Sequence, residues 1–167
     1  MAHITPAGCR TALVAWLEAL PGIATVGRVH NRRRIVRNEA AVKALLAVNG
    51  VVNAWMISPA ASTTTVTERH PGFKGIGQKG GGQVLSTFQW QIEGYYQIDD
   101  AAASETTFHD LAWSVVLDLN EHGALAIPGV VHQLPADIEQ FGYIFLAGYA
   151  LYHYCRIGVA FQGKVVG

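Results

Sequence analysis

Cysteine and charged residues are scarce in this chain of 167 residues. Cys9 and Cys155 are the only cysteines, and neither belongs to a CxxC pair or has histidines at the spacing of a zinc site. We therefore expect two buried free thiols. The apolar runs are much shorter than the roughly 20 residues that span a bilayer, and residues 1–6 lack the features of an export signal. These absences predict a protein of a cytosol-like space without a membrane partner.

Lysine and arginine are absent between Gly80 and Cys155, although the whole chain has no net charge. Up to Lys79, ten basic residues outnumber three acidic ones, which gives a net charge of +7. From Gly80 onward, two basic residues face nine acidic ones, which gives −7. Two interpretations are open. The two parts pair inside one fold, or the basic surface of one subunit meets the acidic surface of the next in a head-to-tail assembly.

The seven histidines form no recognisable catalytic or metal-binding motif, because HExxH, HxH and the nucleophile elbow GxSxG are all missing. Asp99 and Asp100 suit the start of a helix rather than a pair of catalytic carboxylates. His153 lies on the apolar side of a predicted strand, which is typical of a core histidine. We predict no catalytic, metal or cofactor site. An enzyme whose site is assembled from distant residues stays an alternative, and a pocket with shifted pKa values would be its mark.

The most regular pattern in the chain covers Val84–Ile98, where apolar and polar residues alternate. This period of two predicts a long strand with one face in the core and the other, including Glu93, in water. Apolar residues then recur at helical spacing, which predicts an amphipathic helix that ends near His122. These helix positions are Phe108, Leu111, Ala112, Val115 and Leu119. The strand and the helix form the predicted centre of the fold.

Shorter patterns predict the other elements around this centre. Helices are expected over residues 6–20, capped by Thr5, and from Asn38 to a stop at Asn49–Gly50. Strands are expected at residues 23–29, 51–57, 127–134, 141–146 and 149–161, the last two joined as a hairpin. The predicted fold class is α+β, with a mostly antiparallel sheet and two or three helices packed on one face, in a single domain over residues 1–167.

Residues 60–83 interrupt this order, because they are rich in serine, threonine and then glycine and show no core pattern. We interpret them as a long flexible arm between two strands, and a hairpin through residues 63–69 with a glycine-rich tip is one arrangement of it. The segment GIGQKG at residues 75–80 matches GxGxxG, but a polar loop precedes it and a strand follows it, which excludes the dinucleotide-binding context. The arm carries Arg69, Lys74 and Lys79. It would become ordered on a neighbouring subunit or on nucleic acid, and a solvated loop without a role is the alternative.

A second basic segment follows the strand predicted at residues 23–29. It consists of Arg28, Arg32, Arg33, Arg34 and Arg37. Guanidinium groups bind phosphate bidentately, so a nucleic-acid-binding module is one interpretation. The segment has no interleaved aromatic residues and no DNA- or RNA-binding motif around it, which favours a subunit contact or a solvated loop. Arg32, Arg33 and Arg34 are the candidate contact residues.

The order of these elements is familiar when it is combined with the strand FQWQIEGYYQI, the helix FHDLAWSVVLDLNEHG and the late strand YALYHYCRIGVAFQ. In this combination the chain resembles the small tail-terminator proteins of long-tailed bacteriophages. The resemblance covers most of the chain. It rests on the order of the elements and on the residue patterns of these segments rather than on an invariant motif. The long glycine-rich arm is a departure from the family's pattern.

The resemblance implies a homo-hexameric ring that caps the phage tail tube and joins it to the head connector or stopper protein. It places the protein in the neck of the virion, after assembly in the host cytoplasm. DNA would pass through the channel of the ring without specific binding. Our hypothesis is that acidic residues form a channel or interface surface; the candidates are Asp100, Glu105, Asp118 and Glu121. Another head–tail connector or minor tail protein, and a nucleic-acid-binding module, remain the alternatives.

Overall fold

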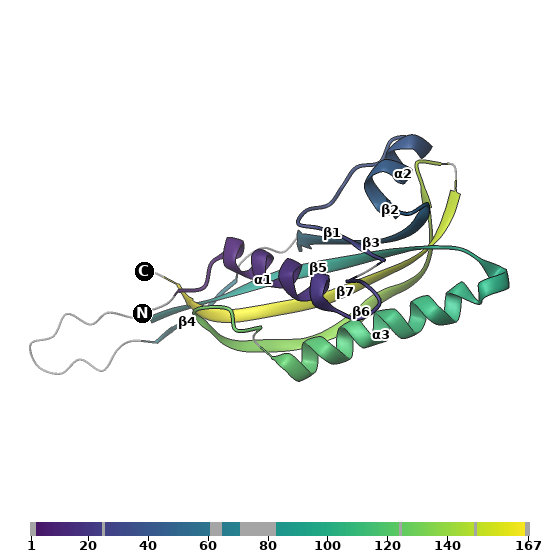
Figure 1. Cartoon of the computed structure of the whole chain (residues 1–167). Coiled ribbons are helices and arrows are strands. Elements are labelled where there is room, and N and C mark those ends of the chain that lie inside the picture. Colours follow the sequence, from purple (N-terminus) through teal and green to yellow (C-terminus); the bar gives the residue numbers. More distant parts are fainter. Residues whose placement is uncertain are drawn as a thin grey trace, which may run out of the picture.

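The fold is given by a computed structural model that describes residues 3–24, 26–60, 65–70, 83–123, 125–148 and 150–165 (Figure 1). The elements in chain order are α1 (Pro6–Ala19), β1 (Arg28–His30), α2 (Glu39–Leu46), β2 (Ala47–Val48), β3 (Val51–Pro59), β4 (Thr65–His70), β5 (Gln83–Gln97), the 3-10 turn η1 (Asp100–Ala102), α3 (Ser104–His122), β6 (Val130–Leu146) and β7 (Ala150–Val165).

The described strands form one twisted sheet in the order β1-β3-β5-β7-β6, in which β2 also pairs with β3 and β4 with β5. The pairing of β1 with β3 is parallel, and every other pairing among the described strands is antiparallel. The predicted α+β class with a mostly antiparallel sheet is therefore confirmed. β1 and β6 lie at opposite edges, with β3, β5 and β7 between them.

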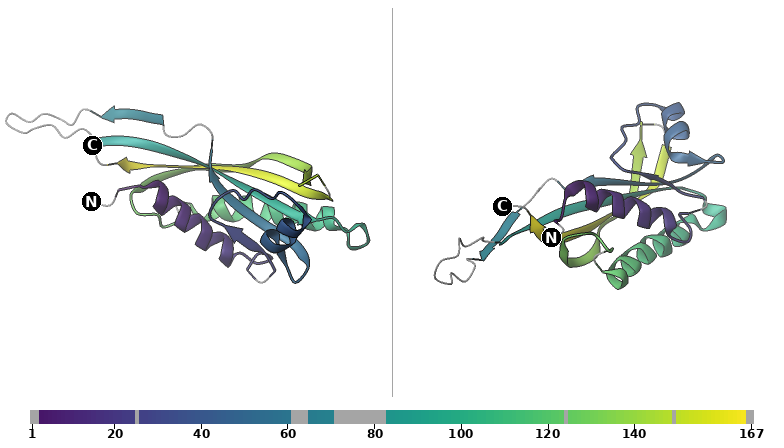
Figure 2. Two further views of the ribbon diagram at one scale, coloured as in Figure 1. Left: turned by 90° about the horizontal axis from the view of Figure 1, so that it is seen from above. Right: turned by 60° about the vertical axis from the view of Figure 1, so that its left-hand side comes forward.

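The predicted central strand and helix, β5 and α3, are present and pack against each other. Trp90 and Ile92 of β5 share one core with Phe108 and Leu119 of α3. Helix α1 covers the same face, and its first turn is capped as expected, because the Thr5 hydroxyl accepts a hydrogen bond from the amide of Gly8 at 3.0 Å. Figure 2 shows α1 and α3 running along the sheet.

Helix α2 packs on the opposite face of the sheet. Val42 and Leu46 of α2 contact a second, smaller core that includes Tyr95 of β5 and Tyr154 of β7. These tyrosines alternate along their strands with residues of the first core, which places α2 across the sheet from α1 and α3. Figures 1 and 2 place α2 at the end of the sheet opposite the end that carries β4. No helix of the described residues therefore lies over much of the face on the α2 side.

Two predicted strands have different bounds in the structure. The strand expected at residues 23–29 is only Arg28–His30, because residues 21–24 form turns that place the Ile23 side chain in the core. The strand expected at residues 127–134 continues to Leu146 as the 17-residue β6. Pro135 does not end it, because the proline lies where the register with β7 shifts, between Leu134 and Asp137.

Two further predictions are wrong, the first for a local reason and the second because of distant contacts. The second helix ends at Leu46, and Asn49–Gly50 instead forms the turn of the β2–β3 hairpin, with φ angles of 52° and 83°. Both residues adopt positive φ, which is the preference of an Asn-Gly hairpin turn. The face of β5 expected in water is also partly covered, because Glu93 and Tyr95 are buried there.

Part of the predicted arm is a strand. Within residues 60–83, Thr65–His70 forms β4, which pairs with the beginning of β5 and contains Arg69. Residues 61–64 and 71–82 lie outside the described part of the chain, and so do Lys74 and Lys79. Among the described residues, no helix combines the length and the apolar character that crossing a membrane requires.

We expect Gly94→Ala to destabilise the protein, because this position of β5 has no space for a side chain. A Cβ atom there would lie 2.8 Å from Sγ of Cys155 and 2.8 Å from Cζ3 of Trp55, two fully buried groups. Overpacking of this kind costs about 1–3 kcal/mol. Urea denaturation measures the loss. Gly142→Ala in β6 is the matched control, because a Cβ there has no neighbour within 4 Å, and its free energy of unfolding should change by less than about 0.5 kcal/mol.

Candidate interaction surfaces

The segment of residues 31–38 between β1 and α2 carries most of the predicted arginine cluster, and we call it the arginine loop. Although it has no helix or strand, it is attached to its surroundings by specific contacts. The amide of Arg34 donates to Sδ of Met56 at 3.2 Å, and its Nε donates to Nδ1 of His30 at 3.4 Å. The other ring nitrogen of His30 hydrogen-bonds the carbonyl of Leu45 at 2.8 Å. The loop is thus held between β3 and α2.

Arg33 binds a carboxylate that is buried in the middle of the sheet. Its Nε lies 3.2 Å from Oε2 of Glu93, whose side chain is only 3% exposed, whereas that of Arg33 is 64% exposed. The contact is an ion pair rather than a well-aligned hydrogen bond. A buried carboxylate requires such partners because it has lost its hydration. Glu93 therefore anchors the arginine loop to β5.

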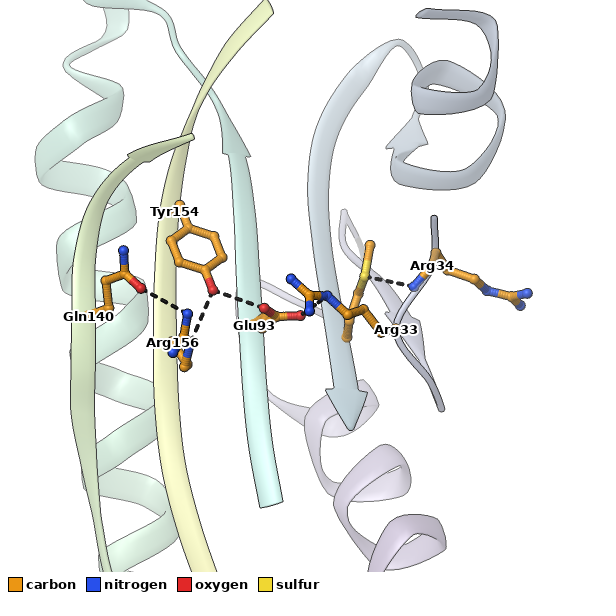
Figure 3. Close-up of polar contacts among 7 residues, drawn as sticks. Arg33, Arg34, Glu93, Gln140, Tyr154 and Arg156 are labelled. Atoms are coloured by element: carbon orange, nitrogen blue, oxygen red, sulfur yellow. Dashed lines mark hydrogen bonds and ion pairs between the residues drawn. The ribbon is translucent and has the colours of Figure 1, made fainter. Parts of the chain in front are cut away.

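The other oxygen of Glu93 begins a chain of polar contacts across β7 to β6 (Figure 3). The phenol of Tyr154 donates to Oε1 at 2.9 Å, and Nε of Arg156 donates to the phenol oxygen at 3.3 Å. Arg156 also donates to Oε1 of Gln140 at 3.0 Å. Burial is the largest cause of the raised pKa of Tyr154, so its phenol stays neutral and available as a donor. The network joins four neighbouring segments of the fold.

Other groups of the arginine cluster behave differently from Arg33. Arg28 donates to the carbonyl of Ala44 at 2.7 Å, whereas Arg32 and Arg37 are exposed. Figure 3 shows the guanidinium of Arg34 pointing away from Glu93. Beside it, Ile35 is 80% exposed, the highest value among the large apolar side chains of the described residues. The loop therefore presents an apolar residue among cations at the β1 side of the sheet.

The four predicted acidic residues do not form one surface. Asp100 and Glu105 are exposed near the beginning of α3, whereas Asp118 and Glu121 lie in its last turns. The 13 residues from Glu105 to Asp118 correspond to about 20 Å of helix. Asp118 also has a structural role, because its Oδ2 accepts a hydrogen bond from the Trp16 indole at 2.5 Å and lies 3.2 Å from His122. It connects α3 to α1.

Asp100 and Glu105 border a group of exposed apolar residues at the end of the sheet, which we call the aromatic patch. It consists of Tyr143, Phe145 and Leu151. Phe145 of β6 and Leu151 of β7 are direct cross-strand partners. Desolvation, followed by the nearby charges of Glu105 and Asp100, raises the pKa of Tyr143. Sequence reasoning missed this patch, because alternation alone does not tell which face of an edge strand has a covering element.

The described residues contain one hydroxyl–imidazole pair, which joins Ser104 of α3 to His153 of β7. Ser104 Oγ and His153 Nε2 share a hydrogen bond at 2.8 Å, and both side chains are buried. The hydroxyl also accepts from the amide of Asp99 at 2.8 Å. Nδ1 of the imidazole has no partner, and the ring stacks on Phe108. A buried pair without a third group positions α3 and offers a substrate no access.

Both cysteines are buried free thiols, as predicted. Burial raises the pKa of Cys9 to about 11 and that of Cys155 to about 12. Thiols with such values are protonated and poorly nucleophilic near neutral pH. Within the described ranges, no three histidine, cysteine or carboxylate side chains are grouped as a metal site would require.

An open depression of about 390 Å³ lies on the sheet face that α2 leaves uncovered. Asp137 and Glu139 border it above a floor that includes Gly158 and Val159. The carboxylate of Glu139 lies over Gly158, where a Cβ atom would be within 3 Å of it, and accepts from Gln91 at 3.5 Å. The depression is acidic and suits a basic side chain better than an anion.

Comparison with known proteins does not assign the chain to a family. No protein-family model matches it, and a search of curated proteins finds no significant match.

We expect Arg33→Ala to destabilise the protein because it leaves the buried Glu93 carboxylate without its ion pair. The loss should lie near the lower end of the 1–3 kcal/mol that an unsatisfied buried group costs, since Arg33 is largely exposed. In the Glu93→Gln background the same change should cost less. A double-mutant cycle in urea measures the coupling. Arg32→Ala is the control, and equal costs in both backgrounds would contradict the assignment.

We expect His153 to make stability depend on pH, because burial lowers its pKa below the ordinary 6.5. Glu105 and Asp100 oppose this shift. A lowered pKa means that the fold favours the neutral ring, so this stability is complete above about pH 6.5 and decreases as the pH falls toward the folded pKa. Titration of His153 changes the free energy of unfolding by at most about 1.4 kcal/mol per pH unit. Denaturation from about pH 7.5 to pH 5 should show a smaller slope for His153→Gln.

His30 needs a parallel control, because burial also lowers its pKa. His30→Gln and the double variant separate the two contributions. If His153→Gln has the wild-type slope, His153 does not titrate on unfolding in this range.

Proposed function

We propose that the protein is a structural protein of the phage tail-terminator type. It assembles head to tail into the six-membered ring of that family's pattern, and the ring caps a tail tube. The observation that carries the proposal is the separation of two complementary surfaces. The arginine loop lies on the α2 face of the sheet, where Val36 packs against the core that contains Leu146 of β6. The acid-bordered aromatic patch lies on β6 and β7 on the α3 face, where Tyr143 contacts His153. Different surfaces on opposite faces favour a heterologous contact over a symmetric one.

The division of the sequence into a basic and an acidic part supports this proposal, because the two parts also occupy different regions of the folded protein. β1, α2 and the arginine loop come from the basic part of the sequence, and α3 and β6 come from the part without lysine or arginine. Arg33 and Glu93 pair inside the fold, so internal pairing accounts for part of the charge. The exposed Arg32 and Arg37 are available to a neighbour.

Exposed apolar residues also support association. Most of them lie on α3, β6 and β7, on the side away from β1: Trp113, Leu117, Val131, Leu134, Tyr143, Phe145 and Leu151. Scattered exposed apolar side chains need no explanation, whereas adjacent ones such as Phe145 and Leu151 mark an interaction surface. A ring of such subunits would use part of this surface between subunits and part for the tail tube and the head connector or stopper protein.

Several arginines bind groups of their own subunit and are therefore less available to DNA phosphates, which suits the passage of DNA through the ring. Arg28, Arg33 and Arg34 make contacts within the subunit, and exposed acidic residues such as Glu121 repel phosphate. We therefore propose that DNA slides through the channel without specific binding. The neck of the virion is the proposed location.

We expect sedimentation velocity to reveal a closed species of about six subunits at high concentration and low salt, which dissociates as salt screens the charged contacts. Negative-stain images should show rings with a central hole. A single subunit at every concentration and salt level would contradict self-assembly. Rings that bind head connectors but not the ends of tail tubes would favour the related connector function instead.

A further inference from the structure

The arginine loop has the properties of a preformed docking element. Ile35 at its centre is almost fully exposed, yet the backbone beside it is held by the contact of Arg34 with Met56 and by the ion pair of Arg33 with Glu93. An exposed apolar side chain on a fixed loop loses little conformational freedom when it binds. The guanidinium of Arg34 and the exposed Arg37 border Ile35 with positive charge.

The aromatic patch has the complementary properties. Phe145 is 68% exposed and Tyr143 is 50% exposed, and Leu151 lies directly across from Phe145. The pairing of β6 with β7 is regular from Phe141 to Leu146, whereas it shifts at three places before Gln140. The patch therefore lies on a regular part of the edge strand. Asp100 and Glu105 border it with negative charge.

We propose that Ile35 of one subunit docks on the aromatic patch of the next, while Arg34 and Arg37 pair with Asp100 and Glu105. This inference rests on the ring proposed above and names the contact that closes it. An apolar centre with a cationic border meets an aromatic centre with an anionic border. The occupant of the patch is a second copy of this chain, because the same chain carries both halves of the contact on opposite faces of its sheet.

Other exposed apolar residues match the loop less well. Trp113 on α3 donates its indole N–H to His109 of the same helix at 3.2 Å. Leu134 lies beside the register shift at Pro135. Leu117 is 56% exposed, but it lies 12 residues beyond Glu105, which is about 18 Å along the helix. These residues are outside the docking contact and are available to other partners.

The test mixes two variants, each of which lacks one half of the contact. Ile35→Asp removes the docking residue but keeps the patch, and Phe145→Asp removes the patch but keeps the loop. Alone, each variant should sediment as a single subunit, with a dissociation constant raised by about 30-fold or more. Mixed in equal amounts, they should form a dimer that does not grow, because one intact contact remains between them. Leu117→Asp is the matched control and should form wild-type rings.

Charge reversal gives a second readout that does not depend on apolar substitutions. Arg37→Glu and Glu105→Arg should each weaken association, and the variant that carries both changes should recover it. Circular dichroism checks that every variant is folded, as expected for changes at exposed side chains.

The failures of the two proposals are distinguishable. Rings that persist in Ile35→Asp and Phe145→Asp, or a mixture that stays as single subunits, would overturn the docking contact and leave the ring standing. If the wild type itself does not associate, the docking contact is tested by disulfide cross-linking of the double variant Ile35→Cys, Phe145→Cys at high protein concentration. Disulfide-linked oligomers, absent from Ile35→Cys with Val131→Cys, would support the contact. Equal or no cross-linking in the two variants would overturn it.

Discussion

A buried carboxylate in the middle strand of the sheet determines how the two parts of this fold meet. Glu93 lies on the sheet face that carries α2, and its burial requires partners on both sides. Tyr154 supplies one from β7, and Arg33 supplies the other from the arginine loop. The same interaction that satisfies the carboxylate thus places a loop without regular structure at a defined position. Its neighbour Ile35 is consequently presented to solvent on a fixed support.

The sheet remains open, and its two edges differ. β1 is a three-residue edge strand followed by cations, whereas β6 is a long edge strand with carboxylates and aromatic residues near it. Open edges that differ in charge and shape favour pairing between unlike surfaces. Register shifts around Pro135 interrupt the first part of β6, which discourages uncontrolled strand addition there. Its regular end carries the aromatic patch.

Local patterns predicted the elements that depend on neighbours in sequence. The alternation of β5, the period of α3, and the caps Thr5 and Asn38 all correspond to the structure. Predictions failed where distant contacts intervened. Glu93 occupies a position that the alternation of β5 assigns to solvent, but Arg33, 60 positions earlier, covers its carboxylate. Gly94 interrupts the apolar alternation of β5 because Trp55 and Cys155 occupy the space that a side chain at this position would need.

The sequence by itself determined the α+β class, the central strand and helix, the basic and acidic parts of the chain and the burial of both cysteines. These properties follow from composition and from periods of two and 3.6 residues, which act over short distances. Only the tertiary structure decided which arginine forms the ion pair with Glu93 and that the four acidic candidates separate into two pairs. It also decided that Tyr143, Phe145 and Leu151 lie together near one edge of the sheet. The reason is physical: burial and surface proximity depend on strand order and on the covering of each face, which pair residues far apart in the chain.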